Sequence, residues 1–404
     1  MDLVGNRNLR GLLDERTIMY AGKVFLVFED KEGVVSEYTY HEFSLQVDAF
    51  AAGLHQLGVD KGDRVTVHLS NSPEILISWF ALATIGAIMV PSNTANTISE
   101  LTHILSYSES VAVITQPSLL EVVQETVKVC PSIKNTILAR SSKPVAGTLS
   151  FDVFLQSPEK PPKVEIDSED VMQILFTSGT TARPKGVQLT HANALRSGER
   201  SSRSLGLDSR DRCMTSLPIF HVNAQSLTVL AALTTGGTCV ILEEYRASKF
   251  WTQVRFHRAT QTSLVAMQAR TLLAQPLSPL DSVHDLRRVF YAINIPEEEK
   301  VAFEGRFAVE LINGYGLSEA MTLVTLSPIF GPKKWPSIGL PVYDRQVRLV
   351  DSDGNDVPVG EPGEIIVHGI PGRTLMKGYY KDPEATSLAL RDNWLYTGDN
   401  RLCG

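Results

Sequence analysis

The sequence predicts an α/β fold: two parallel-sheet α/β subdomains stacked in layers (αβαβα) plus a small β-barrel-like subdomain. Short apolar runs alternate with helical stretches of about 10 to 15 residues through two successive regions, as in parallel sheets covered on both faces. A stretch at 141–163, rich in Pro, Ser and Lys, separates the two regions. After about residue 336, strands and turns follow one another without helices. We therefore expect subdomains over 1–165, 166–335 and 336–404.

The first region begins with a predicted hairpin near 23–40, followed by an amphipathic helix that ends at Gly58. Residues 75–91 carry no charge, but they are slightly short for a membrane span, and Gly86 and Pro91 interrupt them. We therefore expect a buried helix over 72–85, a turn at Gly86 and a core strand over 87–90. The other strands are expected at 64–69, 111–115 and 135–139, with helices at 98–106 and 119–129.

The second region continues the alternation and the third abandons it. Strands are expected at 171–176, 213–217, 238–241, 261–265, 288–291 and 309–312. Helices are expected at 192–205, 224–233, 248–258, 267–274 and 296–306. In the third region, the segments 347–350 and 364–368 have strand character, with a turn at 351–354.

Composition excludes several classes of function. A net charge of -7 and a pI near 5.8 argue against a nucleic-acid-binding protein. The four cysteines lie far apart, without the spacing of a metal site or a disulfide framework, which suits a reducing cytoplasm. The N-terminus interleaves charges with leucines and lacks the apolar region of a signal peptide. We expect a cytoplasmic protein without an integral membrane segment; the sequence does not predict its oligomeric state.

A candidate phosphate loop follows the predicted strand at 171–176. Its small and hydroxyl residues offer backbone and side-chain donors, and a lysine follows four residues later: Thr177, Ser178, Gly179, Thr180, Thr181 and Lys185. Gly186 stands where a Walker A loop has Ser or Thr, so this is not that motif. Taken alone, the stretch fits a polar surface hairpin equally well.

Six motifs in order along the chain resemble the acyl-adenylate-forming superfamily, which includes acyl-CoA synthetases, peptide-synthetase adenylation domains and luciferases. The motifs are GAIMVPSN at 86–93, TSGTTARPKG at 177–186, LPIFH at 217–221, YGLSE at 315–319, GEI at 363–365 and YTGD at 396–399. The likeness covers roughly residues 10 to 400. Stretches such as FTSGTTARPKGV, FWTQV and KKWPSIG most resemble crotonobetaine/carnitine–CoA ligases.

The resemblance implies a role for each motif residue. The loop 177–181 and Lys185 are expected to hold the β- and γ-phosphates of ATP, with Tyr315 and Gly316 beside the adenine. Ser318 is expected to bind a phosphate oxygen, Glu319 to hold Mg²⁺, and Asp399 to accept from the ribose hydroxyls. Lys185, Ser318 and Glu319 are thus the expected catalytic residues. Outside the motif, Tyr315 alone suggests a core residue, Ser318 and Glu319 a helix cap, and Asp399 a turn.

The resemblance also implies an acyl pocket. Its expected lining is Phe220, His221, Asn223 and Gln225, although a buried histidine satisfied within the core is the alternative for His221. If the acid carries a trimethylammonium group, an aromatic wall would bind it by cation–π attraction of up to about 2 kcal/mol. The sequence leaves that wall open among Phe220, Tyr245, Trp251 and Trp335.

The implied reaction is attack of a carboxylate oxygen on the α-phosphorus of ATP, giving an acyl-adenylate for transfer to CoA. Two local departures from the family pattern are Ala182 in place of a loop glycine and the bulkier segment YAIN at 291–294. Relatives continue past YTGD into a C-terminal lid domain, whereas this chain ends at Gly404. We therefore expect ATP and carboxylate binding, weak adenylation and little thioester formation. The alternative is a catalytically silent nucleotide- or acyl-binding module.

Overall fold

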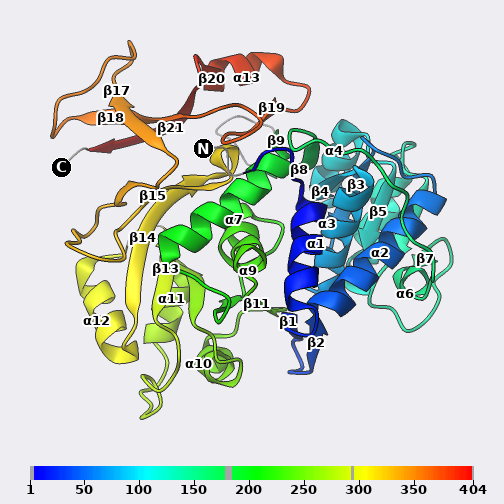
Figure 1. Ribbon diagram of the computed structural model, residues 1–404, viewed down its shortest axis with the longest axis horizontal. Helices are drawn as coiled ribbons and strands as arrows, with labels where there is room; N and C mark the ends of the chain where they lie inside the picture. The colour runs from blue at the N-terminus through cyan, green and yellow to red at the C-terminus, as the bar shows by residue number, and fades with distance from the viewer. Residues whose placement is uncertain (1–3, 178–183, 293–294, 403–404) are drawn as a thin grey trace.

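The computed structural model describes residues 4–177, 184–292 and 295–402. It contains two large sheets, a small antiparallel sheet and three groups of helices (Figure 1). One helix group lies between the large sheets and the other two cover their outer faces, since separate hydrophobic cores form on each side. The predicted α/β class and the αβαβα layering are confirmed.

The first large sheet has eight strands in the order β19-β9-β8-β4-β3-β5-β6-β7. From β8 to β7 all neighbours are parallel, whereas β9 is antiparallel to both β8 and β19. The strands are β3 (Arg64–His68), β4 (Ile88–Pro91), β5 (Ala112–Thr115), β6 (Asn135–Leu138), β7 (Leu149–Ser150), β8 (Val171–Thr177), β9 (Lys185–Thr190) and β19 (Gly378–Tyr379).

The second large sheet has nine strands in the order β16-β15-β14-β13-β12-β10-β11-β1-β2. Its six inner strands from β14 to β1 are parallel, and β2, β15 and β16 are antiparallel additions at the edges. The strands are β1 (Val24–Glu29), β2 (Val35–Thr39), β10 (Arg212–Thr215), β11 (Thr238–Leu242), β12 (Gln261–Val265), β13 (Arg288–Ala292), β14 (Glu310–Leu317), β15 (Thr322–Leu326) and β16 (Leu340–Pro341).

The helices of the middle layer share one core with the inner faces of both sheets. They are α1 (Leu9–Tyr20), α2 (Tyr40–Gln56), α3 (Pro73–Ile85), α7 (His191–Leu205) and α9 (Ala231–Thr235). The outer helices are α4 (Ile98–Ser108) and α5 (Leu120–Val127) on the first sheet, and α10 (Ala247–Phe256), α11 (Ala266–Leu273) and α12 (Glu297–Phe307) on the second. Strand β11 shows the alternation that separates the cores: Cys239 and Ile241 face the middle layer, while Val240 and Leu242 face outward.

Local sequence explains where these helices begin and end. In α2 and α4, a threonine cap and a glutamate three residues later satisfy each other's backbone donors. Helix α3 is apolar because both of its sides are buried, and it ends at Gly86, whose φ of 72° suits glycine. Within the described residues, no helix is long and apolar enough to cross a membrane.

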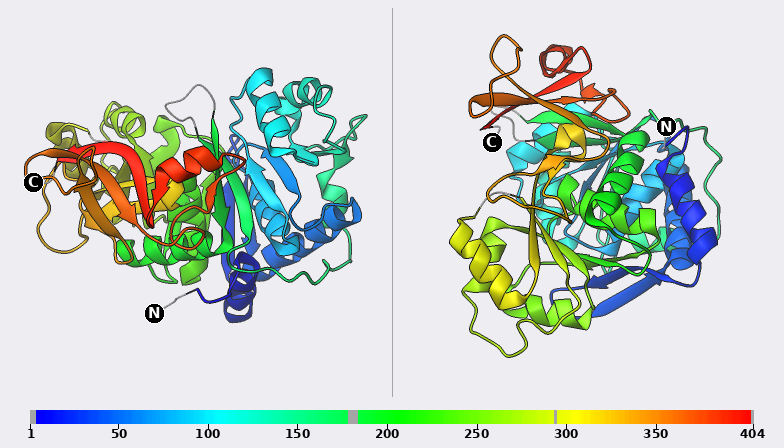
Figure 2. Two further views of the ribbon diagram at one scale, coloured as in Figure 1. Left: turned by 90° about the horizontal axis from the view of Figure 1, so that it is seen from above. Right: turned by 60° about the vertical axis from the view of Figure 1, so that its left-hand side comes forward.

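A small sheet of four antiparallel strands follows, in the order β17-β18-β21-β20. It lies at one end of the layers (Figure 2). Strand β19, which follows β18 in the chain, pairs instead with β9 at the edge of the first large sheet. Its elements are β17 (Gln346–Val350), β18 (Pro362–His368), α13 (Pro383–Ala389), β20 (Leu390–Arg391) and β21 (Trp394–Leu402).

Some elements differ from the prediction. Helices α1 and α13 and strand β15 were not expected, and the connection at 141–163 contains β7 and α6 (Phe151–Leu155). The helix expected at 224–233 is α8 (Val222–Ala224), the π-helical η2 (Gln225–Leu230) and α9. The two large sheets do not divide at residue 165: β8 and β9 join the first sheet, and β1 and β2 join the second. The division of the chain into separate subdomains stays a prediction.

Candidate active site

The phosphate-loop prediction is flanked by two paired strands. Thr177 at the end of β8 lies opposite Lys185 at the start of β9, so the strands hold the two ends of the loop together. The predicted residues Ser178, Gly179, Thr180 and Thr181 lie outside the described residues. The ammonium group of Lys185 lies 5.0 Å from the ring centre of Tyr379 on β19.

Ser318 and Glu319 lie in η3 (Ser318–Ala320), the short turn between β14 and β15. The hydroxyl of Tyr379 donates to Glu319 Oε1 at 2.9 Å. The carbonyl of Glu319 accepts from the amide of Met376 at 2.7 Å. Both the side chain and the backbone of Glu319 are therefore tied to the segment that precedes and forms β19.

The backbone that follows η3 is strained. Met321 has φ 41° and Thr322 has φ 84°, a region that a β-branched residue rarely adopts. The Thr322 hydroxyl makes hydrogen bonds with Ser226 Oγ at 2.6 Å and with the carbonyl of Val222 at 3.1 Å. These contacts from the α8–η2 segment hold the turn in place, as is typical of strained residues at functional sites.

Two buried arginines hold the carbonyl groups of the same turn. Arg200 of α7 makes a two-point ion pair with Asp344, at 2.7 and 2.8 Å, and also donates to the carbonyl of Met321 at 3.4 Å. Arg345 donates to the carbonyls of Ala320 and Leu323. Since α7 begins directly after β9, these contacts connect the strand that carries Lys185 with the turn that carries Glu319.

Tyr315 and Asp399 come together although they lie in different sheets. The Tyr315 hydroxyl donates to Asp399 Oδ2 at 2.6 Å. Burial, and then the hydrogen bond to Asp399, raise the pKa of Tyr315 above its usual range, so the hydroxyl stays a donor. Gly316 is required by close approach, because a Cβ there would overlap the carbonyl oxygen of Thr322. Contact of Tyr315 with adenine and of Asp399 with ribose stay predictions.

A cavity of about 720 Å³ lies beside the phosphate-loop strand. Its wall combines residues from four separate parts of the chain: Pro91, Asn93, Asn96, Ser99, Glu100, His103, Ile104, Leu175, Phe176, Thr177, Pro184, Phe220, His221 and Ser318. Thr177, Ser318, Phe220 and His221 are thus brought together. A second cavity of about 410 Å³, which shares His103 and Pro184 with the first, reaches Lys185.

The His221 side chain opens onto this cavity and its ring contacts that of Phe220, with 4.6 Å between centroids. Surrounding atoms desolvate the imidazole and lower the pKa of His221 below 6.5. The ring is therefore neutral at pH 7. This placement is that of a wall residue and not of a histidine satisfied within the core.

Gln225 does not lie in the cavity wall. Its amide nitrogen donates to the carbonyl of Ile219 at 3.0 Å, and its oxygen accepts from Gln173 of β8 at 3.1 Å. Asn71, which the sequence did not indicate, holds the other side of the segment: it accepts from the amide of Ile219 at 2.9 Å and donates to the carbonyl of Leu217 at 3.0 Å. The two amides fix the 217–221 segment from opposite sides.

Asn223 is half-buried, and its Oδ1 atom has no hydrogen-bond partner among the described residues. Of the four aromatic candidates for a cation site, Phe220 lies in the wall. Trp251 stacks on His284 and Phe307 in the outer core of the second sheet. The Tyr245 hydroxyl bonds to Thr271, and the Trp335 indole donates to the carbonyl of Ile295.

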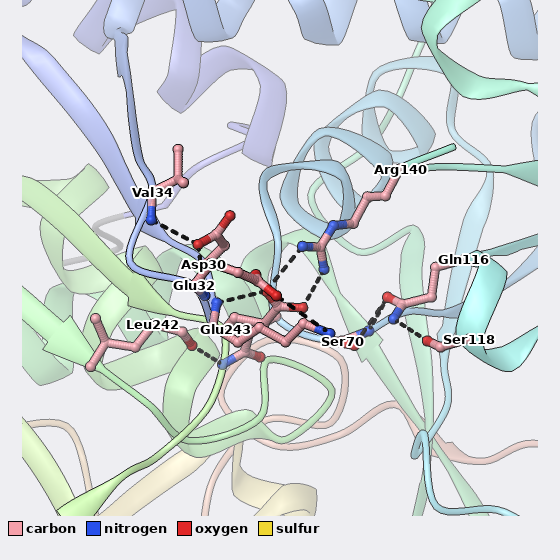
Figure 3. A network of polar contacts seen from close by, with 11 residues as sticks. Asp30, Glu32, Val34, Ser70, Gln116, Ser118, Arg140, Leu242 and Glu243 are labelled. Carbon is pink, nitrogen blue, oxygen red and sulfur yellow. Dashed lines mark hydrogen bonds and ion pairs between the residues drawn. The ribbon is translucent and has the colours of Figure 1, made fainter. Parts of the chain in front are cut away.

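The edge at which the parallel strands of both sheets end is crossed by polar contacts (Figure 3). Arg140 after β6 makes a two-point ion pair with Glu243 after β11, at 2.6 and 3.0 Å. Ser70 and Gln116 join the ends of β3 and β5, and Asn71 also donates to the carbonyl of Leu242 at 3.0 Å. The Arg140–Glu243 and Asn71–Leu242 contacts fasten the two sheets to each other beside the acyl-pocket segment, while Ser70 and Gln116 tie two strands of the first sheet.

The residues present suit Mg²⁺ bound together with phosphates. In the described part of the chain, no group of three or more His, Cys, Asp or Glu residues could hold a metal by itself. Mg²⁺ prefers one or two carboxylates plus phosphate oxygens and water, so the single carboxylate of Glu319 fits that chemistry.

Comparison with known proteins identifies the family. The AMP-binding enzyme family matches residues 13–380. Crotonobetaine/carnitine–CoA ligases of Citrobacter koseri and Salmonella typhimurium are 38% identical over 99% of this chain and 78% of their own length.

Solved structures agree in fold. The N-terminal domain of FACL13 from Mycobacterium tuberculosis has a TM-score of 0.85 at 26% identity, over 98% of this chain and 96% of that one. An anthranilate CoA ligase with bound anthranoyl-AMP has a TM-score of 0.91 at 23% identity, over 99% and 76%. The resemblance found in the motifs is confirmed: the chain belongs to the AMP-binding enzyme family, as an acyl-CoA synthetase of the AMP-forming type.

Proposed function

We propose that this protein activates a small betaine-like carboxylic acid with ATP, forming an acyl-adenylate that is then transferred to CoA. The observation that carries the proposal is the wall of the main cavity, which combines the end of the phosphate-loop strand with the acyl-pocket segment. Thr177 and Ser318 lie in the same wall as Phe220 and His221. An acid held against the two aromatic rings would therefore lie near the phosphates that it attacks.

The reaction needs no nucleophilic side chain, because the carboxylate of the substrate attacks the α-phosphorus and pyrophosphate leaves. The protein must bring two anions together and offset their charge. Lys185 would supply a positive charge at one end of the loop, and the hydroxyls of Thr177 and Ser318 in the cavity wall would donate to phosphate oxygens. When bound, Mg²⁺ would neutralise charge on the phosphates, with Glu319 as its protein ligand.

The electrostatics of the cavity favour an acid that carries a quaternary ammonium group. Phe220 offers an aromatic face, and the neutral ring of His221 does not repel a cation. Glu100 in the wall accepts hydrogen bonds from the backbone and hydroxyl of Thr97, which lower its pKa, so it is a carboxylate at pH 7. Among the described wall residues there is no lysine or arginine. The names of the 38% identical relatives point to the same class of acid.

The cellular setting proposed is a reducing one such as the cytoplasm. Cys213 and Cys239 lie opposite each other on neighbouring strands and remain free thiols, as does Cys130. Burial raises the pKa of both Cys213 and Cys239, which keeps them protonated and unreactive. Besides ATP, CoA and the acid, no macromolecular partner is proposed.

Acid-dependent exchange of labelled pyrophosphate into ATP tests the function. The panel should pair crotonobetaine and carnitine with analogues in which a tert-butyl group replaces the trimethylammonium group, since each pair differs in charge and hardly in shape. We expect the charged acid of each pair to be favoured about 10-fold or more. Lys185→Ala should abolish exchange and serves as the background control.

Two results would contradict the proposal. Equal exchange with both members of each pair would refute the betaine-like substrate while keeping the reaction. A flat panel at the Lys185→Ala background would favour a binding module without catalysis.

A further inference from the structure

Tyr379 contacts both charged residues on which the proposed function depends. Its hydroxyl oxygen is 2.9 Å from Glu319 Oε1, and the Lys185 ammonium lies 5.0 Å from the centre of its ring. Within residues 4–177, 184–292 and 295–402, no ion pair joins Lys185 to Glu319. One tyrosine therefore contacts both the cation and the anion.

The backbone around Tyr379 is fixed to the strand that begins with Lys185. Tyr379 lies opposite Val187 in the β19–β9 pair. The amides of Lys377 and Tyr380 donate to the carbonyls of Gln188 and Gly186, at 2.9 and 2.7 Å. The amide of Tyr379 itself donates to Thr386 Oγ1 at 2.9 Å. The backbone position of Tyr379 thus follows from the sheet and does not depend on its contact with Glu319.

The chemistry of the side chain suits this place. A phenol is an uncharged O–H donor, so Tyr379 donates to the Glu319 carboxylate without adding charge. The face of the ring attracts the ammonium while its edge carries the donor, so the two charges are held at different sides of one side chain.

We propose that Tyr379 is a positioning residue that holds Glu319 and Lys185 apart and oriented, ready for Mg²⁺ and the triphosphate. The proposal rests on the proposed function and extends it to a residue outside the motifs that indicated the site. Without the hydroxyl, Glu319 would lose its donor and could turn toward Lys185. Each charge would then have to be released before it could bind a phosphate or a metal ion.

Calorimetric titration of ATP at a series of free Mg²⁺ concentrations tests this without requiring turnover. Tyr379→Phe removes the donor and keeps the ring, so the Mg²⁺ concentration for half-maximal ATP affinity should rise about 10-fold. Tyr379→Leu removes both, so ATP affinity at saturating Mg²⁺ should fall a further 3- to 10-fold, approximately. Tyr20→Phe is the matched control, because Tyr20, at the end of α1, also has a lysine ammonium over its ring, that of Lys23 at 5.3 Å.

A double-mutant cycle separates positioning from general damage. If Tyr379 acts through Glu319, Tyr379→Phe should have no effect on the Mg²⁺ dependence of a Glu319→Gln protein. An unchanged Mg²⁺ midpoint in Tyr379→Phe, or an equal shift in the Glu319→Gln background, overturns the proposal. Wild-type protein that binds ATP with Mg²⁺ but shows no acid-dependent exchange would refute the proposed function instead. Wild-type protein that binds no ATP would overturn both.

Discussion

Asn71, which follows β3, makes three hydrogen bonds, two of them to the acyl-pocket segment, and its removal tests the pocket directly. The side chain is 6% exposed. It accepts from the amide of Ile219 at 2.9 Å and donates to the carbonyls of Leu217 and Leu242, each at 3.0 Å. In Asn71→Ala all three backbone groups lose their partner, while Gln225 still holds the carbonyl of Ile219.

The expected magnitude follows from those three bonds. A net hydrogen bond contributes about 1 kcal/mol, and a buried group left without a partner costs about 1–3 kcal/mol. Asn71→Ala should therefore lower the free energy of unfolding by about 3 kcal/mol. If the 217–221 segment moves so that its freed backbone groups reach water, the loss of stability will be smaller, but Phe220 and His221 will be less well ordered. The KM for the acid should then rise about 10-fold, with the KM for ATP within about twofold.

Urea unfolding and pyrophosphate exchange at varied acid concentration measure the two effects. Ser70→Ala is the neighbouring control: it removes one hydroxyl bond to Gln116 and no contact with the pocket segment. We expect it to cost about 1 kcal/mol and to leave the acid KM unchanged. The reasoning is refuted if Asn71→Ala costs no more than Ser70→Ala, or if it changes the KM of ATP and acid equally.

Three further predictions concern the turn after the motif and the nucleotide side. Burial opposes the charge of Asp344, but the ion pair with Arg200 outweighs burial and holds the pKa of Asp344 below 3.8. The pair should therefore stabilise the fold fully above pH 4, and this stability should be lost as the pH falls through the lowered pKa. In urea titrations Arg200→Leu should lower the free energy of unfolding by about 3–5 kcal/mol at pH 7 and by less in acid. Gly316→Ala should destabilise the fold by more than about 2 kcal/mol, because its Cβ would overlap the Thr322 carbonyl oxygen. Gly305→Ala, at an open helical position, should be neutral or stabilise the fold by up to about 1 kcal/mol. Similar values for both variants in thermal unfolding would contradict this overlap. Asp399→Asn should weaken ATP binding about 10-fold in calorimetry without changing the acid preference, and unchanged ATP affinity would remove the nucleotide role of Asp399.

The alternation of strands and helices could be predicted because each element has a signal in its own short stretch of sequence. Strands of a parallel sheet are buried on both faces and appear as short apolar runs. Helices α2 and α4 begin at Thr-x-x-Glu capping motifs, which can be recognised in the sequence. The sheet to which each strand belongs could not be predicted, because it depends on distant partners. Leu26 lies opposite Cys239, and Met89 lies opposite Gln173. Helix α1 also has a local signal, because Leu9, Leu12 and Leu13 are spaced to form one apolar face of a helix, and all three are buried.

The candidate site was predictable where a motif carries the chemistry and not where distant residues support it. The motifs indicated Tyr315 and Asp399, and the structure joins them. Gln225 was expected in the pocket wall, but its amide is engaged by Ile219 and Gln173 behind the wall. Asn71 gave no signal, because an asparagine after a strand ordinarily suggests a turn. Its role depends on backbone groups of Leu217 and Ile219, which lie 146 and 148 positions further along the chain.

The exchange of strands between the two sheets also decides how the chain can fold during synthesis. The β1–β2 hairpin leaves the ribosome well before its parallel partner β11. Lys23 and Gly236, which bond beside this pair, are 213 positions apart. Until then β1 exposes an open hydrogen-bonding edge. Meanwhile β8 must return to β4 in the other sheet. Neither sheet can be completed before the other is well advanced. We therefore expect the nascent chain to need protection until β11 has emerged, and then to close both sheets in one cooperative step.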